Sequence, residues 1–477
     1  MVIVGCGGDD DGSGGSGAAA GTGATAGSGG SGGGSAGSGT GASAGVGGGS
    51  AGVGGGTGGG GTGGGGTGGT GGSTSASCAP LPPASGATVE VTPGKSIGDA
   101  LKGAAAGTTI LLADGTYDVS GDPIYITTAG ITIRGKSGNR AAVILDSKHV
   151  DNGTGGIISV RSSNVTIAHL TLKEARFHAI HVSGGQSATT TGTRIHDVHV
   201  LDPGEQGIKI NASGTNYTDD GEISCSRIEM TRPGAAFVQT KVSSGSKCYT
   251  GGVDAHDARG WVVRDNHIEG FWCEGSGGEY LAEHGIHFWT GSRDTIVERN
   301  VLVNNARHIG FGLVGTGRTY SDNPCPGQSK VGHYGGSIVN NFMVANDPKL
   351  HASGNGFDSG VSLWYSCGTD VLHNSIASTQ APKSSGIEYR FSSTSANIAN
   401  NMSTHAFKMR DGAKATLQTN VENAATSDFV SVAGADLHLT AGASAALDKG
   451  TDLSAKVSTD FDGESRSKTP DIGADER

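Results

Sequence analysis

The sequence predicts an all-β protein whose short parallel strands coil into a solenoid, preceded by a long tether without stable structure. Three observations support this prediction. A five-residue pattern of glycine followed by alternating apolar and variable residues recurs along the chain. A second short segment containing asparagine follows four copies of this pattern after 14 or 15 residues. Residues 7–77 consist almost entirely of Gly, Ser, Ala and Thr.

The tether comes first along the chain. A segment of this composition cannot bury enough apolar surface to offset the entropy of ordering, so residues 7–77 are expected to be a disordered linker. The remaining body, 78–477, has about 400 residues and can form a large core. It exceeds the usual size of one domain, but repeat architectures commonly do so.

The first six residues, MVIVGC, resemble the end of a bacterial lipoprotein signal, in which small residues precede a cysteine that becomes lipidated. The resemblance implies lipidation of Cys6 and makes residues 1–6 a truncated remnant, because the charged and full apolar segments of such a signal are missing. The alternative is an accidental likeness, with Cys6 a buried or stray thiol.

Six further cysteines remain, an even number that suits an oxidising, extracytoplasmic compartment and up to three disulfides. Cys225 and Cys248 flank one excursion of the chain and are expected to pair. Cys325 is expected to pair with either Cys273 or Cys367. The spacing of the cysteines and histidines does not indicate a zinc site.

Each copy of the five-residue pattern is expected to be one strand. Apolar residues at every second position place one face of the strand in a core and the variable residues on the other face. Such a strand cannot bury its apolar face alone, so consecutive copies are expected to stack as rungs in parallel sheets. The copies begin at Ala179, Gly207, Gly252, Gly285, His308, Gly360 and Gly386.

The asparagines of the second segments are expected to stack as well. Asparagine side chains in register along parallel strands can hydrogen-bond from one rung to the next, which gives them a structural role. They are Asn266, Asn300, Asn341, Asn374 and Asn401.

With these repeats, the chain resembles the right-handed parallel β-helix family, the pectate-lyase-like superfamily. The opening segment VEVTPGKSIGDALKGAAAGTTILLADGTYDVS and the rungs ITIRG and NVTIAHLTL are similar to that family. The ending TDFDGESRSKTPDIGADER is similar to the tail of exported bacterial members. The resemblance implies a short capping helix over Ile97–Ala105, a β-helix over 78–440, and a tail, 441–477, packed on the helix end.

Charge and hydropathy limit the partners. The formal net charge is −11, and Asp9, Asp10 and Asp11 carry three of these charges, which leaves −8 on the body. A body of this sign without a run of basic residues is not expected to bind nucleic acid. The chain has no apolar stretch of 18 residues, so a membrane would be reached only through a lipid anchor. We expect a monomer.

Alignment of the copies predicts one outward face rich in ionisable groups, with neighbouring rungs ~4.8 Å apart. The first outward column contains His181, Lys209, Asp254, His287, Gly310, Ser362 and Glu388, and the second contains Ser183, Asn211, His256, Trp289, Gly312, Trp364 and Arg390.

Gly310 and Gly312 would leave a bare rung between Trp289 and Trp364, on which a sugar ring could lie between the two indoles. These four residues and His256 are the candidate substrate-binding set. The alternative is that the glycines relieve crowding beneath the loop 314–335.

The outward groups fit a polysaccharide lyase acting on a uronate. Such an enzyme needs a base for the proton alpha to the carboxylate, and a cation or Ca²⁺ to neutralise that carboxylate. We expect Lys209, His287, Arg390 and Glu388 to be the catalytic groups. Glu283 and His284 precede a strand, so their side chains either cap the turn or reach this face.

Asp254 and Asp257 are the candidate Ca²⁺ ligands. A glycosidase is less favoured, because it needs two carboxylates ~5–9.5 Å apart and Asp254 and Glu388 lie too many rungs apart. The known catalytic motifs of the resembled family are absent from the sequence. The competing hypotheses are a non-catalytic surface protein for glycan binding or adhesion, and a purely structural envelope protein.

Overall fold

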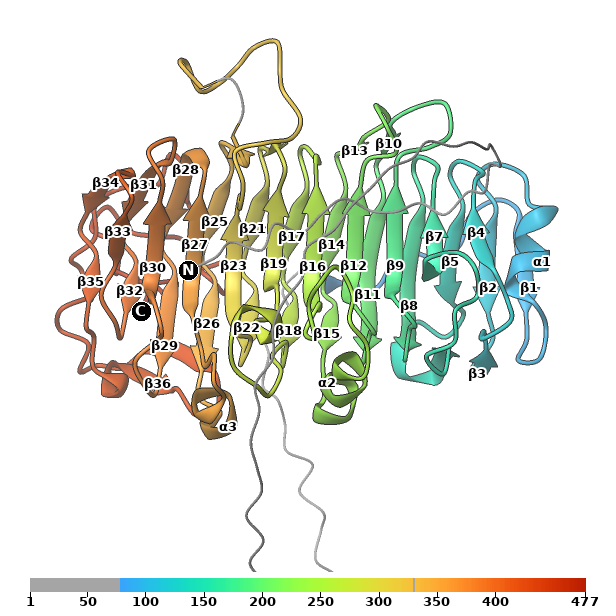
Figure 1. The fold of residues 1–477 in the computed structure, drawn as a ribbon, viewed down its shortest axis with the longest axis horizontal. Coiled ribbons are helices and arrows are strands. Elements are labelled where there is room, and N and C mark those ends of the chain that lie inside the picture. Colours follow the sequence, from blue (N-terminus) through green and yellow to red (C-terminus); the bar gives the residue numbers. More distant parts are fainter. Residues whose placement is uncertain (1–77, 329–330) are drawn as a thin grey trace, which may run out of the picture. The chain divides into compact units, whose positions relative to one another are not determined.

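The computed structural model describes residues 78–328 and 331–477, and these form a parallel β-helix (Figure 1). The predicted all-β solenoid is confirmed. The expectations for Cys6 and for the linker 7–77 lie outside the described residues. Among the helices of the described part, none is long and apolar enough to cross a membrane.

One wall of the β-helix is a ten-stranded parallel sheet, which we call the first sheet. Figure 1 shows most of its strands side by side along the coil. In stacking order the strands are β4 (Ile124–Ile126), β7 (Gly156–Val160), β9 (His178–Ser183), β12 (Gln206–Asn211), β16 (Gly251–His256), β19 (His284–Trp289), β23 (Arg307–Phe311), β27 (Ser359–Trp364), β30 (Ser385–Arg390) and β33 (Lys408–Arg410).

The rest of the coil is a 23-stranded sheet in which two parallel ladders share β8 (Thr166–Lys173) and β11 (Arg194–Leu201). The first ladder contains β1 (Thr88–Val91), β2 (Thr109–Leu112), β5 (Thr132–Gly135), β14 (Glu222–Ser224), β17 (Val262–Arg264), β21 (Ile296–Glu298), β25 (Ser337–Val339), β28 (Ser366–Leu372), β31 (Ser395–Ala399) and β34 (Lys414–Gln418).

The second ladder turns the chain back toward the first sheet. It contains β3 (Gly115–Asp118), β6 (Val143–Asp146), β15 (Arg227–Glu229), β18 (His267–Glu269), β22 (Val301–Val303), β26 (Phe342–Ala345), β29 (Ser375–Ser378), β32 (Met402–Ser403) and β35 (Val421–Glu422). Shorter pieces are β20 (Ser292–Arg293) and β24 (His333–Tyr334) of the same sheet, and the pairs β10 (Thr190–Thr191) with β13 (Thr218–Asp219) and β36 (Phe429–Ser431) with β37 (Asp436–Leu439).

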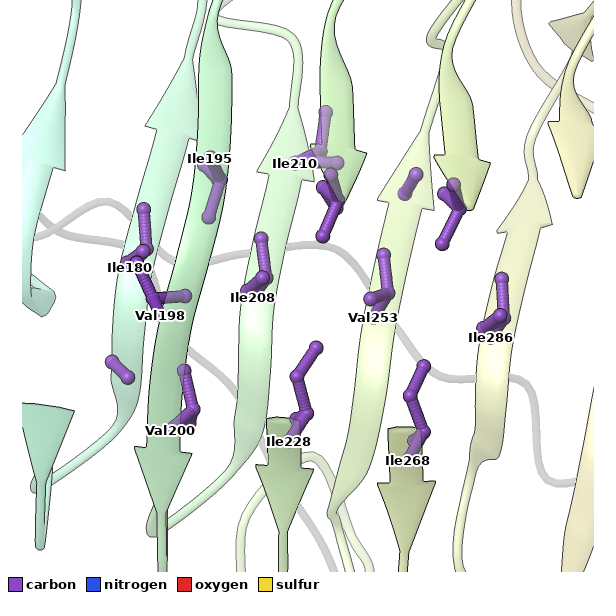
Figure 2. Close-up of a cluster of buried hydrophobic side chains, with 14 of the residues drawn as sticks. Ile180, Ile195, Val198, Val200, Ile208, Ile210, Ile228, Val253, Ile268 and Ile286 are labelled. Atoms are coloured by element: carbon purple, nitrogen blue, oxygen red, sulfur yellow. The ribbon is translucent and has the colours of Figure 1, made fainter. Parts of the chain in front are cut away.

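The core consists of apolar columns that run from rung to rung. Ile208 of β12 pairs with Ile180 of β9 and with Val253 of β16, and Val253 pairs with Ile286 of β19. Figure 2 shows these side chains in line, facing residues of the opposite walls such as Ile228. The predicted alternation of core and outward side chains is therefore confirmed. Successive rungs keep the same register, and a strand side chain changes faces only when the register slips by one residue.

The asparagine ladder is also confirmed. The Nδ2 of Asn300 donates to Oδ1 of Asn341 (3.0 Å), and the Nδ2 of Asn341 donates to Oδ1 of Asn374 (2.9 Å). Asn341 also donates to the Val339 carbonyl of its own turn and to the Val297 carbonyl of the preceding rung, so a buried turn between the two ladders has its polar groups paired. The ladder extends from Asn266 to Asn420.

Replacing Asn341 with alanine is expected to lower the free energy of unfolding by about 3 kcal/mol, because buried amide and carbonyl groups on two rungs lose their partners. Denaturant unfolding followed by circular dichroism measures the loss. The control is Asn397→Ala, which removes one half-buried bond to Asp370 and should cost less than about 1 kcal/mol. Equal losses in the two variants would contradict a structural ladder.

Helix α1 (Ile97–Lys102) covers the first rungs, as predicted, although it ends before the expected Ala105. The Ser96 side chain accepts from the Asp99 amide, and the Asp122 carboxylate accepts from the Ile97 amide, so the helix start has its partners. Gly103 is the C-cap. Two further short helices, α2 (Arg232–Gln239) and α3 (Pro348–Ala352), follow strands of the second ladder.

The tail beyond Leu439 packs on the last rungs. The Arg466 guanidinium donates to Oδ1 of Asn340 (2.8 Å) and to the carbonyls of Gly473 and Ala474. Ile472 and Ala474 belong to a second apolar cluster with Phe342 and Met402. The tail therefore adds buried apolar area to the outside of the coil.

The disulfides correct one prediction. The structure pairs Cys78 with Cys225 and Cys248 with Cys273, so the expected Cys225–Cys248 bond is wrong. Cys325 pairs with Cys367, which is one of the two alternatives that the sequence left open. Each bond joins segments that become neighbours through the coil, so distance along the sequence is a poor guide to pairing.

Candidate active site on the outer face of the first sheet

The first outward column has the predicted register. Lys209 pairs with His181 on one side and Asp254 on the other, and Asp254 pairs with His287. The column continues from His287 through Gly310 and Ser362 to Glu388. The second column places His256 beside Trp289 and Trp364 beside Arg390. The ionisable residues therefore line one face, as expected.

The centre of this face is a triangle of three polar atoms. The Nζ of Lys209 lies 2.7 Å from Oδ2 of Asp254 and 3.0 Å from Nε2 of His256, and that Nε2 lies 3.1 Å from the same Oδ2. Lys209 and Asp254 are buried, whereas the His256 side chain is 17% exposed. His256 is therefore the member of the triangle that solvent or a ligand reaches.

Asp254 is the anion of this cluster. Burial alone would raise the pKa of its carboxyl, but the Lys209 ammonium and the contact with His256 outweigh burial and hold the pKa well below its usual range. Its second oxygen, Oδ1, accepts from Nε1 of Trp289 (2.8 Å). Asp254 therefore stays ionised and connects Lys209, His256 and Trp289.

Trp289 and His287 pack beside the triangle. Their rings stack with centroids 5.4 Å apart and 4° between planes, and the His256 ring meets the indole edge-on, with a centroid distance of 4.3 Å and 66° between planes. The Nε2 of His287 lies 3.2 Å from the carbonyl oxygen of Gly312, and its Nδ1 lies 3.6 Å from Oδ1 of Asp254. Trp289 therefore packs against the triangle of Lys209, Asp254 and His256.

Glu283 and His284 reach the same face, which resolves the two alternatives for them. The Glu283 amide donates to the Thr250 carbonyl (2.8 Å), which fixes the residue beside Gly251, where a Cβ would lie 2.9 Å from that of Glu283. The Oε2 of Glu283 lies 3.2 Å from Nδ1 of His287. The rings of His284 and His287 have centroids 4.4 Å apart.

The bare glycine rung is a correction. A Cβ on Gly310 would lie 2.6–2.7 Å from three atoms of the His284 ring, so that ring occupies the space where a sugar was expected. Gly312 has φ +74°, and a Cβ there would lie 2.0 Å from the Trp364 carbonyl oxygen, so this glycine is required by the turn. Trp289 and Trp364 do lie two rungs apart, on β19 and β27.

Glu388 and Arg390 form a separate cluster around Trp364. Glu388 accepts from Nε1 of Trp364 (2.7 Å) and from the Arg410 guanidinium (2.7 Å), while Arg390 forms an ion pair with Asp411. Glu388 lies three rungs from His287, with β23 and β27 between them, or about 14 Å at the spacing of strands in a sheet. The four expected catalytic residues therefore do not meet in one site.

The two candidate Ca²⁺ ligands, Asp254 and Asp257, are not brought together in one site either. Asp257 follows β16 in a turn, at φ 55°, and its Oδ1 accepts from the Arg318 amide (2.8 Å). Burial raises the pKa of this carboxyl. Among the described residues, the groups of three or more ligands close enough for a metal do not contain Asp254 or Asp257.

One column of the face was missed by the sequence alignment. The residue before each five-residue pattern is also in register, since His284 pairs with Arg307, and Arg307 pairs with Ser359. His284 and Arg307 project from this position, and the Arg307 guanidinium lies 5.4 Å from the centre of the Trp364 ring. This column could have been found in the sequence as the polar residue just before a copy of the pattern, such as His284 before Gly285 and Arg307 before His308.

The sequence matches no family model and no curated protein. Among solved structures, the chain is similar to a rhamnogalacturonan lyase, with a TM-score of 0.50 and 12% identity over 75% of this chain and 97% of that one. It is similar to the pectate lyase Pel9A, with a TM-score of 0.47 and 15% identity over 82% of this chain and 96% of that one.

An alginate lyase from Paenibacillus sp. str. FPU-7 is similar as well, with a TM-score of 0.45 and 17% identity over 69% of this chain and 99% of that one. At such identities a likeness shows the fold alone. The first of these comparisons, together with the sheet topology, shows that the chain is a right-handed parallel β-helix.

Proposed function

We propose that this protein is a polysaccharide lyase that acts on an acidic, uronate-containing glycan outside the cytoplasm. The observation that carries the proposal is the triangle of Lys209, Asp254 and His256 on the outer face of the first sheet. The three disulfides of the described residues agree with an oxidising compartment. Lipidation of Cys6 remains part of the proposal.

His256 is the proposed general base. In the tautomer in which its Nε2–H donates to the ionised Asp254, its Nδ1 carries a lone pair and Asp254 stabilises the imidazolium that forms; Lys209 then donates to Asp254 and not to Nε2, because an ammonium cannot accept. Lys209 holds Asp254 in place and keeps it ionised. The partial exposure of His256 lets Nδ1 meet a substrate, whereas Lys209 and Asp254 are positioning residues.

The reaction then needs one proton acceptor. His256 takes the proton alpha to the uronate carboxylate, the electrons of that C–H bond form the new double bond, and the glycosidic C–O bond breaks. The same imidazolium returns its proton to the leaving oxygen, so charge and protons balance within one residue. The substrate is a uronate in this proposal because only a carboxyl group acidifies that proton enough for a histidine base.

The test is incubation of the full chain with pectate, alginate and glycosaminoglycans, followed by ultraviolet absorbance of unsaturated uronides. We expect one of them to be cleaved, and His256→Gln to lower kcat about 10²- to 10⁴-fold. The control is His267→Gln, which changes a histidine paired with Glu269 on another wall and should leave the rate unchanged.

The same reactions run in deuterated water separate the competing hypotheses. Deuterium incorporated at the carbon alpha to the carboxylate without unsaturated product would show proton abstraction without elimination, and would overturn the lyase. Neither product nor exchange on any acidic glycan, together with glycan binding that Trp289→Ala abolishes, would favour the non-catalytic binding protein.

A further inference from the structure

We propose that Glu283, His284 and His287 form a binding site for a transition-metal dication of the zinc class. One carboxylate and two imidazoles meet here on the outer face of the first sheet, beside the triangle of Lys209, Asp254 and His256. Binding of the metal is independent of the proposed lyase reaction.

The spacing of the ligand atoms fits a small cation. One ligand atom from each of the three residues lies within 4.8 Å of the others. Oε2 of Glu283 and Nδ1 of His287 are 3.2 Å apart. Two ligands on a tetrahedral zinc ion with bonds of 2.0–2.1 Å are about 3.3 Å apart, so Glu283 and His287 already have the separation of two zinc ligands.

His284 supplies the second, independent observation. Its side chain is 1% exposed, and neither ring nitrogen has a hydrogen-bond partner. A buried polar group without a partner costs about 1–3 kcal/mol, so native structures rarely leave one unless it has another use.

His287 is oriented as a ligand. The Gly312 carbonyl can only accept, so Nε2 of His287 carries the proton and donates to it (3.2 Å). In the neutral ring, Nδ1 then presents its lone pair to Oε2 of Glu283 and, at 3.6 Å, to Oδ1 of Asp254. A lone pair facing two carboxylates is unfavourable, and either a proton on Nδ1 or a metal cation between these groups removes the repulsion. A carbonyl on the second ring nitrogen is the usual support of a histidine ligand.

The backbone makes room for this arrangement. Gly310 lies on the rung next to His287, and any Cβ there would lie 2.6 Å from Nε2 of His284. The glycine therefore leaves space for the His284 ring over this rung, with its centroid 4.4 Å from that of His287. This gives a variant that disturbs the site without removing a ligand.

The chemical types of the three ligands indicate which metal this site would bind. Two imidazoles and one carboxylate favour zinc and its neighbours over Ca²⁺, which takes six or more oxygen ligands. Three protein ligands leave one coordination position open, the arrangement of catalytic rather than structural zinc sites. If the proposed function holds, that open position neutralises the substrate carboxylate next to His256.

The experiment uses the full chain with Cys6→Ser, so that no thiol outside the disulfides binds metal, after treatment with chelator. Calorimetry with Zn²⁺ and visible absorption with Co²⁺ are expected to show one equivalent bound, with the intense spectrum of tetrahedral cobalt. His284→Ala, Glu283→Gln and Gly310→Ala should each weaken Zn²⁺ binding about 100-fold or more, whereas His267→Gln should not.

Circular dichroism shows which variants fold, and Glu283→Gln, an exchange of nearly equal size, serves if the others do not. A folded parent that binds neither ion at one equivalent overturns the proposal. So does a folded Glu283→Gln or His284→Ala variant that binds Zn²⁺ as tightly as the parent. Binding is measured without polysaccharide, so the failure of the lyase assay leaves this result unaffected.

Discussion

Replacing Lys209 with methionine is expected to lower the free energy of unfolding by about 3–5 kcal/mol. The change leaves the Asp254 carboxylate buried without the ammonium that lies 2.7 Å away. A buried charge without its partner costs far more than a surface charge, because the surrounding side chains solvate it poorly. The loss should appear as a lower urea midpoint with an unchanged slope.

Two further variants test this explanation. Lys209→Met combined with Asp254→Asn should regain most of the loss, because the asparagine carries no charge and still accepts from Trp289. Lys148→Met breaks an ion pair of similar length, 2.6 Å, whose side chains are 55% and 56% exposed, and should lower the free energy of unfolding far less than Lys209→Met does. If Lys209→Met costs no more than Lys148→Met, the buried pair does not stabilise the fold.

Acid is expected to unfold the protein through its buried neutral histidines. The pKa values of His308, His333 and His373 are lowered to about 3, chiefly because burial disfavours the charged ring. In the unfolded chain these rings titrate near pH 6.5. The unfolded state therefore binds more protons below that value, so stability present above pH 6.5 is lost as the pH falls toward 3.

His373 shows why the native ring resists protonation. Its Nε2 accepts from Nδ2 of Asn400 (2.9 Å), and its Nδ1 donates to the Gly473 carbonyl (3.2 Å). A proton on Nε2 would face the amide donor, and the charge of Arg466 adds repulsion. His373→Gln should reduce the slope of unfolding free energy between pH 6 and 4 by about 1.4 kcal/mol per pH unit.

Urea unfolding at a series of pH values measures this slope. The control is His267→Gln, since the His267 side chain is 34% exposed and paired with Glu269. A slope that is the same in the parent and in His373→Gln would show that this histidine already carries a proton in the native state.

The repeat could be predicted because its information is local. Period two fixes which side chains of a strand face the core, and stacking of identical rungs then fixes the register. Ile208, Val253 and Ile286 followed from the glycine pattern alone, and so did the outward partners Lys209, Asp254 and His287. The asparagine ladder was predictable for the same reason.

The site could be predicted only in part. The sequence placed His256 and Asp254 in neighbouring columns, yet did not group them with Lys209 into a triangle. It also joined Glu388 and Arg390 to the same site, although they lie on β30, four rungs from Asp254, and form ion pairs with Arg410 and Asp411. A column gives the order of residues along the sheet, whereas a contact depends on the length and rotamer of each side chain.

By itself, the sequence determined the solenoid, the alternation of core and outward side chains within each copy of the pattern and the order of the two predicted outward columns, because each of these follows from spacing along the chain. Only the tertiary structure decided the disulfides, the place of the His284 ring over Gly310 and the approach of Glu283 to His287. These depend on how loops return to the coil and which rotamers fit, so residues far apart in sequence determine them together.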